Sequence, residues 1–289
     1  MGKASHSTGG IRDILQAAQQ QLGAHTTADE ARREAEILLA YALRQSRSFL
    51  YTWPEHAPQP EQSAAFLTLL ARRCAGEPIA YLTGEREFWD MTLRVTPATL
   101  IPRPETETLV EQALERIPPQ ARWQIADLGT GSGAIALAIA RERPGCRLVA
   151  TDLSAAALAV AGDNAVRYAV PNIRFVEGAW LAPLADTRFE MIISNPPYVH
   201  PDDPHLQQGD LRFEPLSALH SGPDGMTDIR TIGDTARQHL HAAGWLLLEH
   251  GFDQGPATRA CLTGLGYRQV QTIEDLAHQP RVTLGCWPG

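Results

Sequence analysis

The residues best suited to chemistry are Asn195, Pro196, Pro197 and Tyr198, which directly follow the short apolar run 191–193. The apolar run is typical of a buried strand, and the two prolines end it because neither can donate to a sheet ladder. The Asn195 side-chain oxygen and the Pro196 carbonyl can each accept one hydrogen of a planar NH2 group, while the Tyr198 ring packs on its flat face. The alternative interpretation is a loop that only uses prolines to turn.

A glycine-rich loop predicts a second functional feature, a binding site for a nucleoside. The loop joins a strand over 123–128 to a helix over 134–141 and consists of Gly129, Thr130, Gly131, Ser132 and Gly133. Glycines let the backbone approach a ligand closely, and the start of the helix offers free N–H groups. Asp152 ends the next strand about twenty residues further on, where a carboxylate can accept both ribose hydroxyls of an adenosine.

The spacing of the glycines indicates which cofactor the loop binds. Gly-x-Gly-x-Gly suits the amino-acid tail of S-adenosylmethionine better than the pyrophosphate of a dinucleotide, which leaves NAD as the alternative. The sequence contains no Gly-Lys-Ser or Gly-Lys-Thr phosphate loop, which argues against a P-loop NTPase. Trp180 follows a third strand over 173–176 and could stack on adenine, although a tryptophan in the core fits the sequence equally well.

These residues share one position in the expected fold. The ends of the predicted strands carry Asp127, Gly129, Asp152, Trp180 and Asn195. In open α/β sheets, ligands bind outside the carboxyl ends of the strands. The sequence therefore predicts an α/β fold in which the glycine loop and the Asn195 corner meet at one edge of the sheet.

The elements that position this edge fall into two domains. A disordered leader is expected over 1–10, and a small helical bundle over 11–83. A β-hairpin is expected as the connection over 84–100. The second domain, over 101–289, alternates strands and helices, which predicts a mostly parallel sheet that becomes antiparallel at its end.

Periodicity and capping signals place the individual elements. Helices are expected over 11–22, 31–43, 46–51, 60–74, 105–117, 153–168, 228–243 and 255–265. Beyond those given above, strands are expected over 87–89, 93–95, 147–151, 191–193, 244–249, 269–273 and 281–286.

The composition argues against several classes of protein function. The net charge is −8, and basic residues form no run longer than a pair such as Arg32-Arg33, which argues against binding to duplex DNA. The apolar stretches are far too short to span a bilayer, and residues 1–10 lack the apolar segment of a signal peptide, so no membrane partner is expected. The four cysteines are scattered without a Cys-x-x-Cys pair, which favours reduced thiols and a cytoplasmic location.

Three further features each allow two interpretations. Arg103, held at a rigid turn between two prolines, either pairs with a carboxylate or is a surface charge. Glu249 ends a buried strand and is either a site carboxylate or, as we prefer, a structural acid. The irregular stretch 200–213 fits a mobile loop over the site better than a metal site, although it contains His200, Asp202, Asp203, His205 and Asp210.

Motifs along most of the chain resemble those of the release factor glutamine methyltransferases, a family called PrmC or HemK. The Asn-Pro-Pro-Tyr corner is also shared with adenine-N6 DNA methyltransferases. The Ile-Pro-Arg-Pro-Glu-Thr-Glu run, combined with an N-terminal helical domain, is more specific to this family. The resemblance extends from about Ile11 to the C-terminus, in the family's order, through motifs at 76–84, 88–89, 101–107, 129–133, 195–198, 203–205 and 212–215.

The resemblance implies a Rossmann-like class I methyltransferase sheet and a specific reaction. S-adenosylmethionine would methylate the side-chain amide nitrogen (N5) of the glutamine in the Gly-Gly-Gln motif of bacterial peptide chain release factors. By position, the loop 129–133, Asp152 and Asn195 would hold the cofactor, and Trp180 would line its adenine. The corner 195–198 would hold the glutamine.

The resemblance also implies which parts of the chain touch the substrate protein. At one position the chain departs from the family pattern. It places Arg103 on the substrate side and implies that the N-terminal bundle touches the release factor. Many members have an acid before the tryptophan, where this chain has Ala179. A side-chain contact from this position to the adenine amine is therefore missing, and backbone groups would have to replace it.

Two other functions remain open from the sequence. An adenine-N6 methyltransferase acting on nucleic acid would share the corner but would need a basic groove. A non-catalytic protein that senses S-adenosylmethionine would have no use for a corner that holds an amide.

Overall fold

The computed structural model describes residues 9–24, 26–204 and 209–289. Apart from its last two residues, the leader expected over 1–10 lies outside the described residues. The chain divides into two compact units, Met1–Gly84 and Glu85–Gly289. Within the described part of the chain, no helix is long and apolar enough to cross a bilayer.

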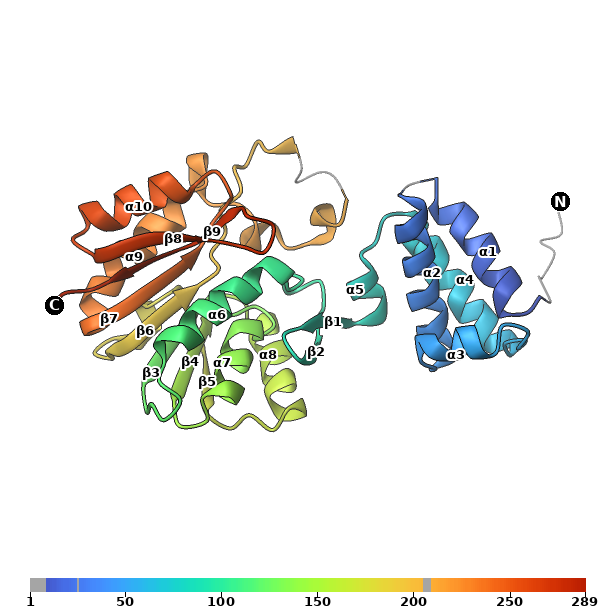
Figure 1. The fold of residues 1–289 in the computed structure, drawn as a ribbon, viewed down its shortest axis with the longest axis horizontal. Coiled ribbons are helices and arrows are strands. Elements are labelled where there is room, and N and C mark those ends of the chain that lie inside the picture. Colours follow the sequence, from blue (N-terminus) through green and yellow to red (C-terminus); the bar gives the residue numbers. More distant parts are fainter. Residues whose placement is uncertain (1–8, 25, 205–208) are drawn as a thin grey trace. The chain divides into compact units, whose positions relative to one another are not determined.

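Helices build the first unit (Figure 1). A capping box begins the second helix, because the Thr27 hydroxyl accepts from the Glu30 N–H at 3.3 Å and the Glu30 carboxylate accepts from the Thr27 N–H. The last short helix was not predicted, since five residues are too few to show a helical period. The helices are α1 (Ile11–Leu22), α2 (Ala28–Leu43), α3 (Arg47–Thr52), α4 (Pro60–Cys74) and α5 (Ile79–Thr83).

The hairpin that opens the second unit has its turn at Trp89-Asp90, one residue earlier than predicted. Phe88 pairs with Met91, and Trp89 adopts the left-handed region with a φ of 57°. Both Phe88 and Met91 are buried in a core cluster of the second unit. The strands of the hairpin are β1 (Glu85–Phe88) and β2 (Met91–Arg94).

A sheet of seven strands, counted over the described residues, forms the middle layer of the second unit. Its order is β5-β4-β3-β6-β7-β9-β8, and only the two pairs that involve β9 are antiparallel. The mostly parallel α/β sheet with an antiparallel end is therefore confirmed. The strands are β3 (Gln124–Leu128), β4 (Arg147–Asp152), β5 (Ile173–Glu177), β6 (Phe189–Ser194), β7 (Leu240–Glu249), β8 (Arg268–Glu274) and β9 (Pro280–Cys286).

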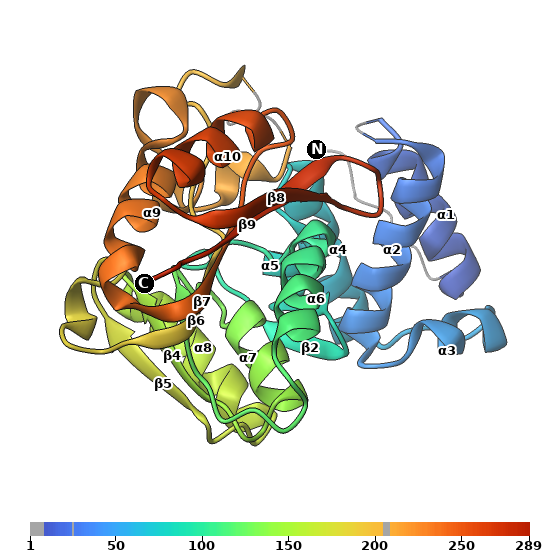
Figure 2. The same ribbon diagram turned by 60° about the vertical axis from the view of Figure 1, so that its left-hand side comes forward.

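Helices cover both faces of this sheet (Figure 2). On β6, Met191 and Ile193 belong to one core cluster, whereas Ile192 belongs to another, because successive side chains of a strand point to opposite faces. The first cluster contains residues of α6 (Glu107–Arg116), α7 (Ala134–Glu142) and α8 (Ala155–Arg167). The second contains residues of α9 (Thr227–His239) and α10 (Gly255–Gly264).

The predicted boundary between α9 and β7 is wrong. The helix expected over 228–243 ends at His239, and β7 begins at Leu240 instead of residue 244. The alanines that follow favour a helix locally, but Leu240 pairs with Phe189 of the neighbouring strand β6. The pairing of the strands therefore overrides the local preference for a helix.

The strand order reverses beside β3. From β3 the chain moves outward through β4 to β5, and it then returns to place β6 on the other side of β3. Ligands of doubly wound sheets bind at such a reversal, outside the carboxyl ends of the strands. The glycine loop follows β3 and the Asn195 corner follows β6, so both predicted features lie at this point.

Short 3-10 helices occupy the connections of the second unit, including two segments near the site described next. They are η1 (Pro104–Thr106), η2 (Ala182–Leu184), η4 (Leu211–Phe213), η5 (Leu216–Ala218) and η6 (Gly222–Asp224).

Candidate active site

Three neighbouring strands bring the predicted site residues to one edge of the sheet. Leu128 of β3 pairs with Thr151 of β4 on one side and with Ser194 of β6 on the other. The next residue of each segment therefore leaves the edge beside the other two. These three residues are Gly129, Asp152 and Asn195.

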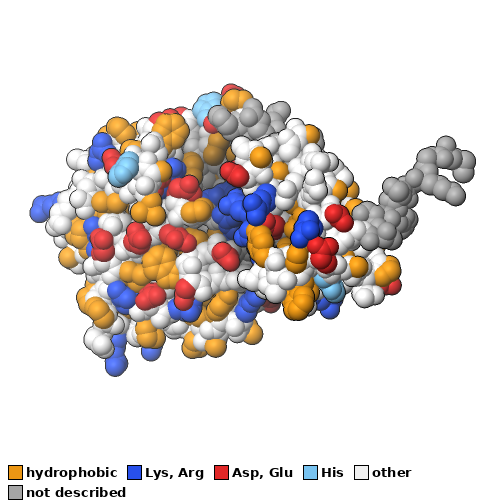
Figure 3. All heavy atoms as spheres, turned by 45° about the vertical axis from the view of Figure 1, so that its right-hand side comes forward, with side chains coloured by type: hydrophobic (Ala, Val, Ile, Leu, Met, Phe, Trp, Pro, Cys, Tyr) orange, Lys and Arg blue, Asp and Glu red, His pale blue; other side chains and the backbone are white. Residues whose placement is uncertain are grey.

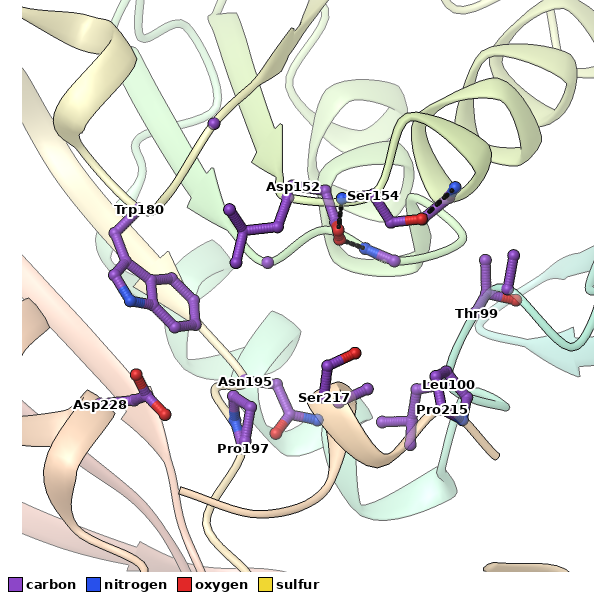
Figure 4. Close-up of a pocket in the computed structure, with 17 residues that line it drawn as sticks. Thr99, Leu100, Asp152, Ser154, Trp180, Asn195, Pro197, Pro215, Ser217 and Asp228 are labelled. Carbon is purple, nitrogen blue, oxygen red and sulfur yellow. Dashed lines mark hydrogen bonds between the residues drawn. The ribbon is translucent and has the colours of Figure 1, made fainter. Parts of the chain in front are cut away.

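A cavity of about 280 Å³ opens at this edge (Figure 4). Six of the predicted residues line it: Gly129, Gly131, Asp152, Trp180, Asn195 and Pro197. The remaining predicted residues do not belong to the lining. They are Arg103, Thr130, Ser132, Gly133, Pro196 and Tyr198.

The sequence did not identify a further group of lining residues. Some follow the hairpin or β4, others come from the stretch after η4 that carries no period, and Asp228 lies in the first turn of α9. Only their position next to recognised motifs could have suggested them. They include Thr99, Leu100, Leu153, Ser154, Pro215, Ser217 and Asp228.

The glycine loop is held tightly under the cavity. The Gly129 and Thr130 N–H groups both donate to the Thr151 carbonyl at 2.9 Å. Gly129 has a φ of 72°, and a Cβ added to it would lie 3.1 Å from the Trp180 ring. A side chain at Gly129 would therefore strain the backbone and press on the indole that borders the cavity.

Asp152 is fixed by backbone groups on both of its carboxylate oxygens. Its Oδ2 accepts from the Gly131 N–H at 2.9 Å, and its Oδ1 accepts from the Ser154 N–H at 2.9 Å (Figure 4). Each carboxylate oxygen has a further lone pair, so the group can still accept from the two hydroxyls of a ribose. The predicted distance between the glycine loop and this acid therefore corresponds to a direct contact.

Asp127 lies at the end of β3 and is fully buried. Its Oδ2 accepts from the Thr130 hydroxyl at 2.6 Å, whereas its Oδ1 has no hydrogen-bond partner among the described residues. Burial raises the pKa of this carboxyl from 3.8 to about 7, and the nearby charge of Asp152 adds to the shift. A cation bound beside the loop would oppose this shift.

Trp180 has both of the roles considered for it. Its ring borders the cavity, and it also packs against the core cluster between the sheet and α9. Its backbone has a φ of 48°, and its carbonyl accepts from the Thr151 hydroxyl at 2.9 Å. Leu153, which is 68% exposed, adds another apolar side chain to the lining. A flat aromatic ligand would find apolar contacts on both residues.

Asn195 lines the cavity and is held at one end of its amide. Its Nδ2 donates to the Thr106 hydroxyl at 3.3 Å, and its Oδ1 has no hydrogen-bond partner within the described part of the chain. The following residues are anchored from behind. The Tyr198 N–H donates to the Leu219 carbonyl at 3.1 Å, and the Tyr198 carbonyl accepts from Gln254 Nε2 at 2.9 Å.

The Tyr198 side chain points into a buried polar cluster. Its hydroxyl faces Glu249, at the end of β7, and burial raises the pKa of the phenol. Glu249 is 1% exposed, and burial raises its pKa to about 7, although the nearby hydroxyls of Thr106 and Tyr198 act to lower it. Its Oε2 has no partner among the described residues.

Arg103 is paired, as one of the two interpretations predicted. Its guanidinium forms an ion pair with Glu214, whose side chain is buried. Glu214 also accepts from the Ile101 N–H at 3.0 Å. This acid therefore joins the segment before α6 to the segment that contributes Pro215 and Ser217 to the cavity.

The stretch 200–213 is only partly described, because 205–208, including His205, lie outside the described residues. Elsewhere in the described chain, no group of three or more histidines, cysteines or acids could hold a metal ion.

The fold and the site together define a class of protein. A sheet of this order, with a glycine loop after β3 and an acid at the end of β4, is the class I methyltransferase fold. A methyltransferase from Pyrococcus furiosus shares this fold. Its crystal structure matches with a TM-score of 0.53 at 19% identity and covers 76% of this chain and 97% of its own.

The sequence comparisons identify the family. Residues 13–84 match the PrmC N-terminal domain, and residues 106–209 match the methyltransferase small domain. The release factor glutamine methyltransferase of Vibrio cholerae is 48% identical over 276 residues, which cover 95% of this chain and 96% of that protein. The protein of the same name from Escherichia coli (strain K12) is 50% identical over 257 residues, which cover 89% and 92%. The chain belongs to the release factor glutamine methyltransferase family, which confirms the resemblance seen in the sequence.

Proposed function

We propose that this protein transfers a methyl group from S-adenosylmethionine to the side-chain amide nitrogen (N5) of the glutamine in the Gly-Gly-Gln motif of bacterial peptide chain release factors. The observation that carries the proposal is that the glycine loop and the Asn195 corner line one cavity. A methyl donor and an amide acceptor can therefore meet there. The names of the relatives indicate the acceptor protein.

The residues of the donor side fit a cationic nucleoside. Asp152 can accept from ribose hydroxyls, and Trp180 and Leu153 offer apolar surface to adenine. The unpartnered Oδ1 of Asp127 puts a buried carboxyl below the loop, where a positive charge favours its ionised form. When bound, S-adenosylmethionine supplies an electrophilic methyl group on a sulfonium. The methyl side chain of Ala179 cannot accept a hydrogen bond from the adenine amine, so a backbone group would have to make that contact.

The residues of the acceptor side compensate for the weak nucleophilicity of an amide. The lone pair of the nitrogen is delocalised into the carbonyl, which opposes attack on carbon. Asn195 Oδ1, which has no partner among the described residues, accepts one N–H of the glutamine. The other N–H is assigned to the carbonyl of Pro196, the next residue of the corner, although Pro196 is not among the residues that line the cavity. These two hydrogen bonds strengthen as the nitrogen becomes tetrahedral, so they stabilise the transition state more than the ground state. Alignment of the nitrogen with the methyl group supplies the rest, and its proton leaves after transfer.

Other residues support this arrangement. The placement of Tyr198 behind Asn195 favours a role in holding the corner over direct stacking on the amide. Arg103 remains our candidate for contacts with the substrate, because its partner Glu214 leaves it 30% exposed. The helical unit over 11–83 is proposed to bind the body of the release factor. The four free cysteines are consistent with a reducing, cytoplasmic location.

The direct test is to incubate the protein with S-adenosylmethionine and a bacterial release factor, and to analyse the Gly-Gly-Gln peptide by mass spectrometry. We expect one added methyl group on the glutamine with the wild-type protein and none with Asn195→Ala. A parallel incubation with labelled cofactor and duplex DNA tests adenine methylation. Label in DNA but not in the release factor would overturn the proposal, as would cofactor binding without transfer to either.

A further inference from the structure

We propose that Gln254 is a positioning residue whose side-chain amide holds the Asn195 corner in place for methyl transfer. Gln254 lies at the start of α10, and neither it nor any residue of α10 lines the cavity. The inference rests on the proposed function and extends it, because the corner can align an acceptor only if its own backbone is fixed.

The two prolines of the corner leave Tyr198 as its first complete backbone anchor after Asn195. Neither proline has an N–H, so neither can donate a hydrogen bond to the surrounding structure. The Tyr198 N–H donates to the Leu219 carbonyl at 3.1 Å, and the Tyr198 carbonyl accepts from Gln254 Nε2 at 2.9 Å. Because the rings fix φ at both prolines, the link is stiff and a displacement of Tyr198 moves Asn195 as well.

The side-chain amide of Gln254 joins three separate segments. Besides the contact with Tyr198, its Nε2 donates to the Gly225 carbonyl at 3.3 Å, and its Oε1 accepts from the Gly251 N–H at 2.9 Å. A backbone carbonyl can only accept and an N–H can only donate, so the amide fits this place in one orientation. The segments it joins are the corner, the stretch before α9 and the turn after β7.

The stretch before α9 approaches this contact closely. Gly225 has a φ of 70°, and a Cβ added to it would press on the Tyr198 carbonyl and lie 2.8 Å from Gln254 Nε2. Any side chain at this position would therefore push the segments apart. Asp228, three residues further on, lines the cavity. The amide of Gln254 thus fixes the corner against the segment that carries another part of the cavity wall.

The turn that carries Gln254 is itself anchored. His250 is fully buried, and burial lowers the pKa of its imidazole, so the ring is neutral. Its Nδ1 donates to the Gly251 carbonyl at 2.8 Å, and its Nε2 accepts from the Thr283 hydroxyl of β9 at 2.8 Å. The Gln254 carbonyl accepts from the Thr258 N–H at 2.9 Å and from its hydroxyl at 3.0 Å. The amide therefore extends from a fixed base.

Two substitutions of Gln254 separate its hydrogen bonds from its bulk. Gln254→Leu keeps a similar size and removes all three bonds. Gln254→Glu keeps an oxygen for the Gly251 N–H but replaces the donating NH2 group by a second oxygen. When ionised, this oxygen faces the Tyr198 and Gly225 carbonyls without a hydrogen to share. When protonated, it can donate to one of them.

The matched control is Gln279→Glu, which makes the same exchange in the turn between β8 and β9. There Nε2 donates to the Ala277 carbonyl at 3.5 Å, and the turn contributes no residue to the cavity. Both glutamate variants add one negative charge to a surface on which acidic and basic side chains already lie beside one another (Figure 3). A general effect of charge on turnover would therefore appear in both variants.

The assay measures kcat and KM for release-factor methylation, the Kd for S-adenosylmethionine by calorimetry and the melting temperature, between about pH 5.5 and 8.5. We expect Gln254→Leu to lower kcat by about tenfold or more at every pH, with a Kd near the wild-type value because the contacts of Asp152 remain. The kcat of Gln254→Glu, divided by that of the wild type, should rise by at least about fivefold from the highest to the lowest pH. The two carbonyls favour the protonated acid and raise its pKa.

The charged groups around Tyr198 and the turn of Gln254 are present in all four proteins. Dividing by the wild-type kcat at the same pH therefore removes their own titration from the comparison. They include Asp224, Glu249, His250, Asp253, Arg259 and Arg281.

The recovery of Gln254→Glu at low pH cannot come from misfolding, because one protein is measured throughout. A leucine variant with a kcat within about threefold of wild type would overturn the inference. A Gln254→Glu ratio that does not change with pH, or the same change in Gln279→Glu, would also overturn it. So would a loss of cofactor affinity in parallel with kcat, which indicates general damage to the fold. A wild-type protein that does not methylate release factors would instead refute the proposed function, and the inference with it.

Discussion

Asp127→Asn tests the electrostatics beneath the glycine loop through the stability of the protein. The carboxyl of Asp127 is buried, and its only side-chain hydrogen bond within the described part of the chain comes from the Thr130 hydroxyl. Asparagine has nearly the same shape and keeps an oxygen that can accept from Thr130. It differs in that it cannot ionise.

The size and the sign of the effect follow from the pKa of Asp127. The carboxyl titrates near 3.8 in the unfolded chain and at about 7 in the folded protein. Below about pH 4 both states hold the proton, so the group does not change the free energy of unfolding. Between these values only the unfolded state releases the proton, and stability therefore falls as the pH rises. Above about pH 7 the loss is complete and amounts to about 4 kcal/mol.

The assay is urea unfolding of the cofactor-free protein over a pH series from about 4 to 9. We expect Asp127→Asn to match the wild type near pH 4 and to be more stable than it at pH 8. Glu249 also has a raised pKa, but it is present in both proteins, so its contribution cancels in the difference. A difference that does not change with pH, or a wild type that is the more stable protein at pH 8, would refute the assignment of a buried neutral carboxyl.

Three further predictions concern the site and its support. Asn195→Ala should lower kcat by about a hundredfold or more, while the glycine loop and Asp152 largely preserve cofactor binding, and kinetics with calorimetry would expose an error if turnover stayed unchanged. Asp152→Ala should weaken the binding of S-adenosylmethionine by at least about tenfold, because the ribose contact and the restraint on Gly131 are both lost; an unaltered Kd would contradict this. Glu214→Ala should lower the free energy of unfolding by about 2 kcal/mol, since it leaves the Ile101 N–H and the Arg103 guanidinium without their carboxylate. Urea unfolding at neutral pH measures this change, and an unchanged midpoint of the urea transition would contradict it.

Much of the fold could be predicted because local signals agree with the structure. The apolar stripe of α1 and the Pro60 start of α4 gave the bounds of these helices, since both signals act within a few residues. The two halves of the site could also be predicted to meet. The glycine loop and the Asn195 corner each follow a buried strand, and parallel strands end at a common edge.

The features that could not be predicted depend on contacts between distant segments. The end of α9 is set by the pairing of Leu240 with Phe189, which outweighs the helix preference of the alanines after it. The hydrogen bond between Asn195 and Thr106 joins two distant segments, and the place of Glu249 beside the Asn195 corner depends on the order and register of β6 and β7, which no local pattern encodes. Glu249 was therefore interpreted as a structural acid, and Thr106 was not singled out although it lies within a recognised motif.

The separate cores of the two units have a consequence for the history of such a chain. The hydrophobic cluster of the helical unit lies within residues 11–82, and the clusters of the sheet unit begin at Phe88. A break near Gly84 therefore severs no hydrophobic cluster. Over evolutionary time the helical unit can change its surface, or be replaced, without opening a void in the sheet unit, and a chimaera that exchanges the helical unit at this junction keeps both interiors filled.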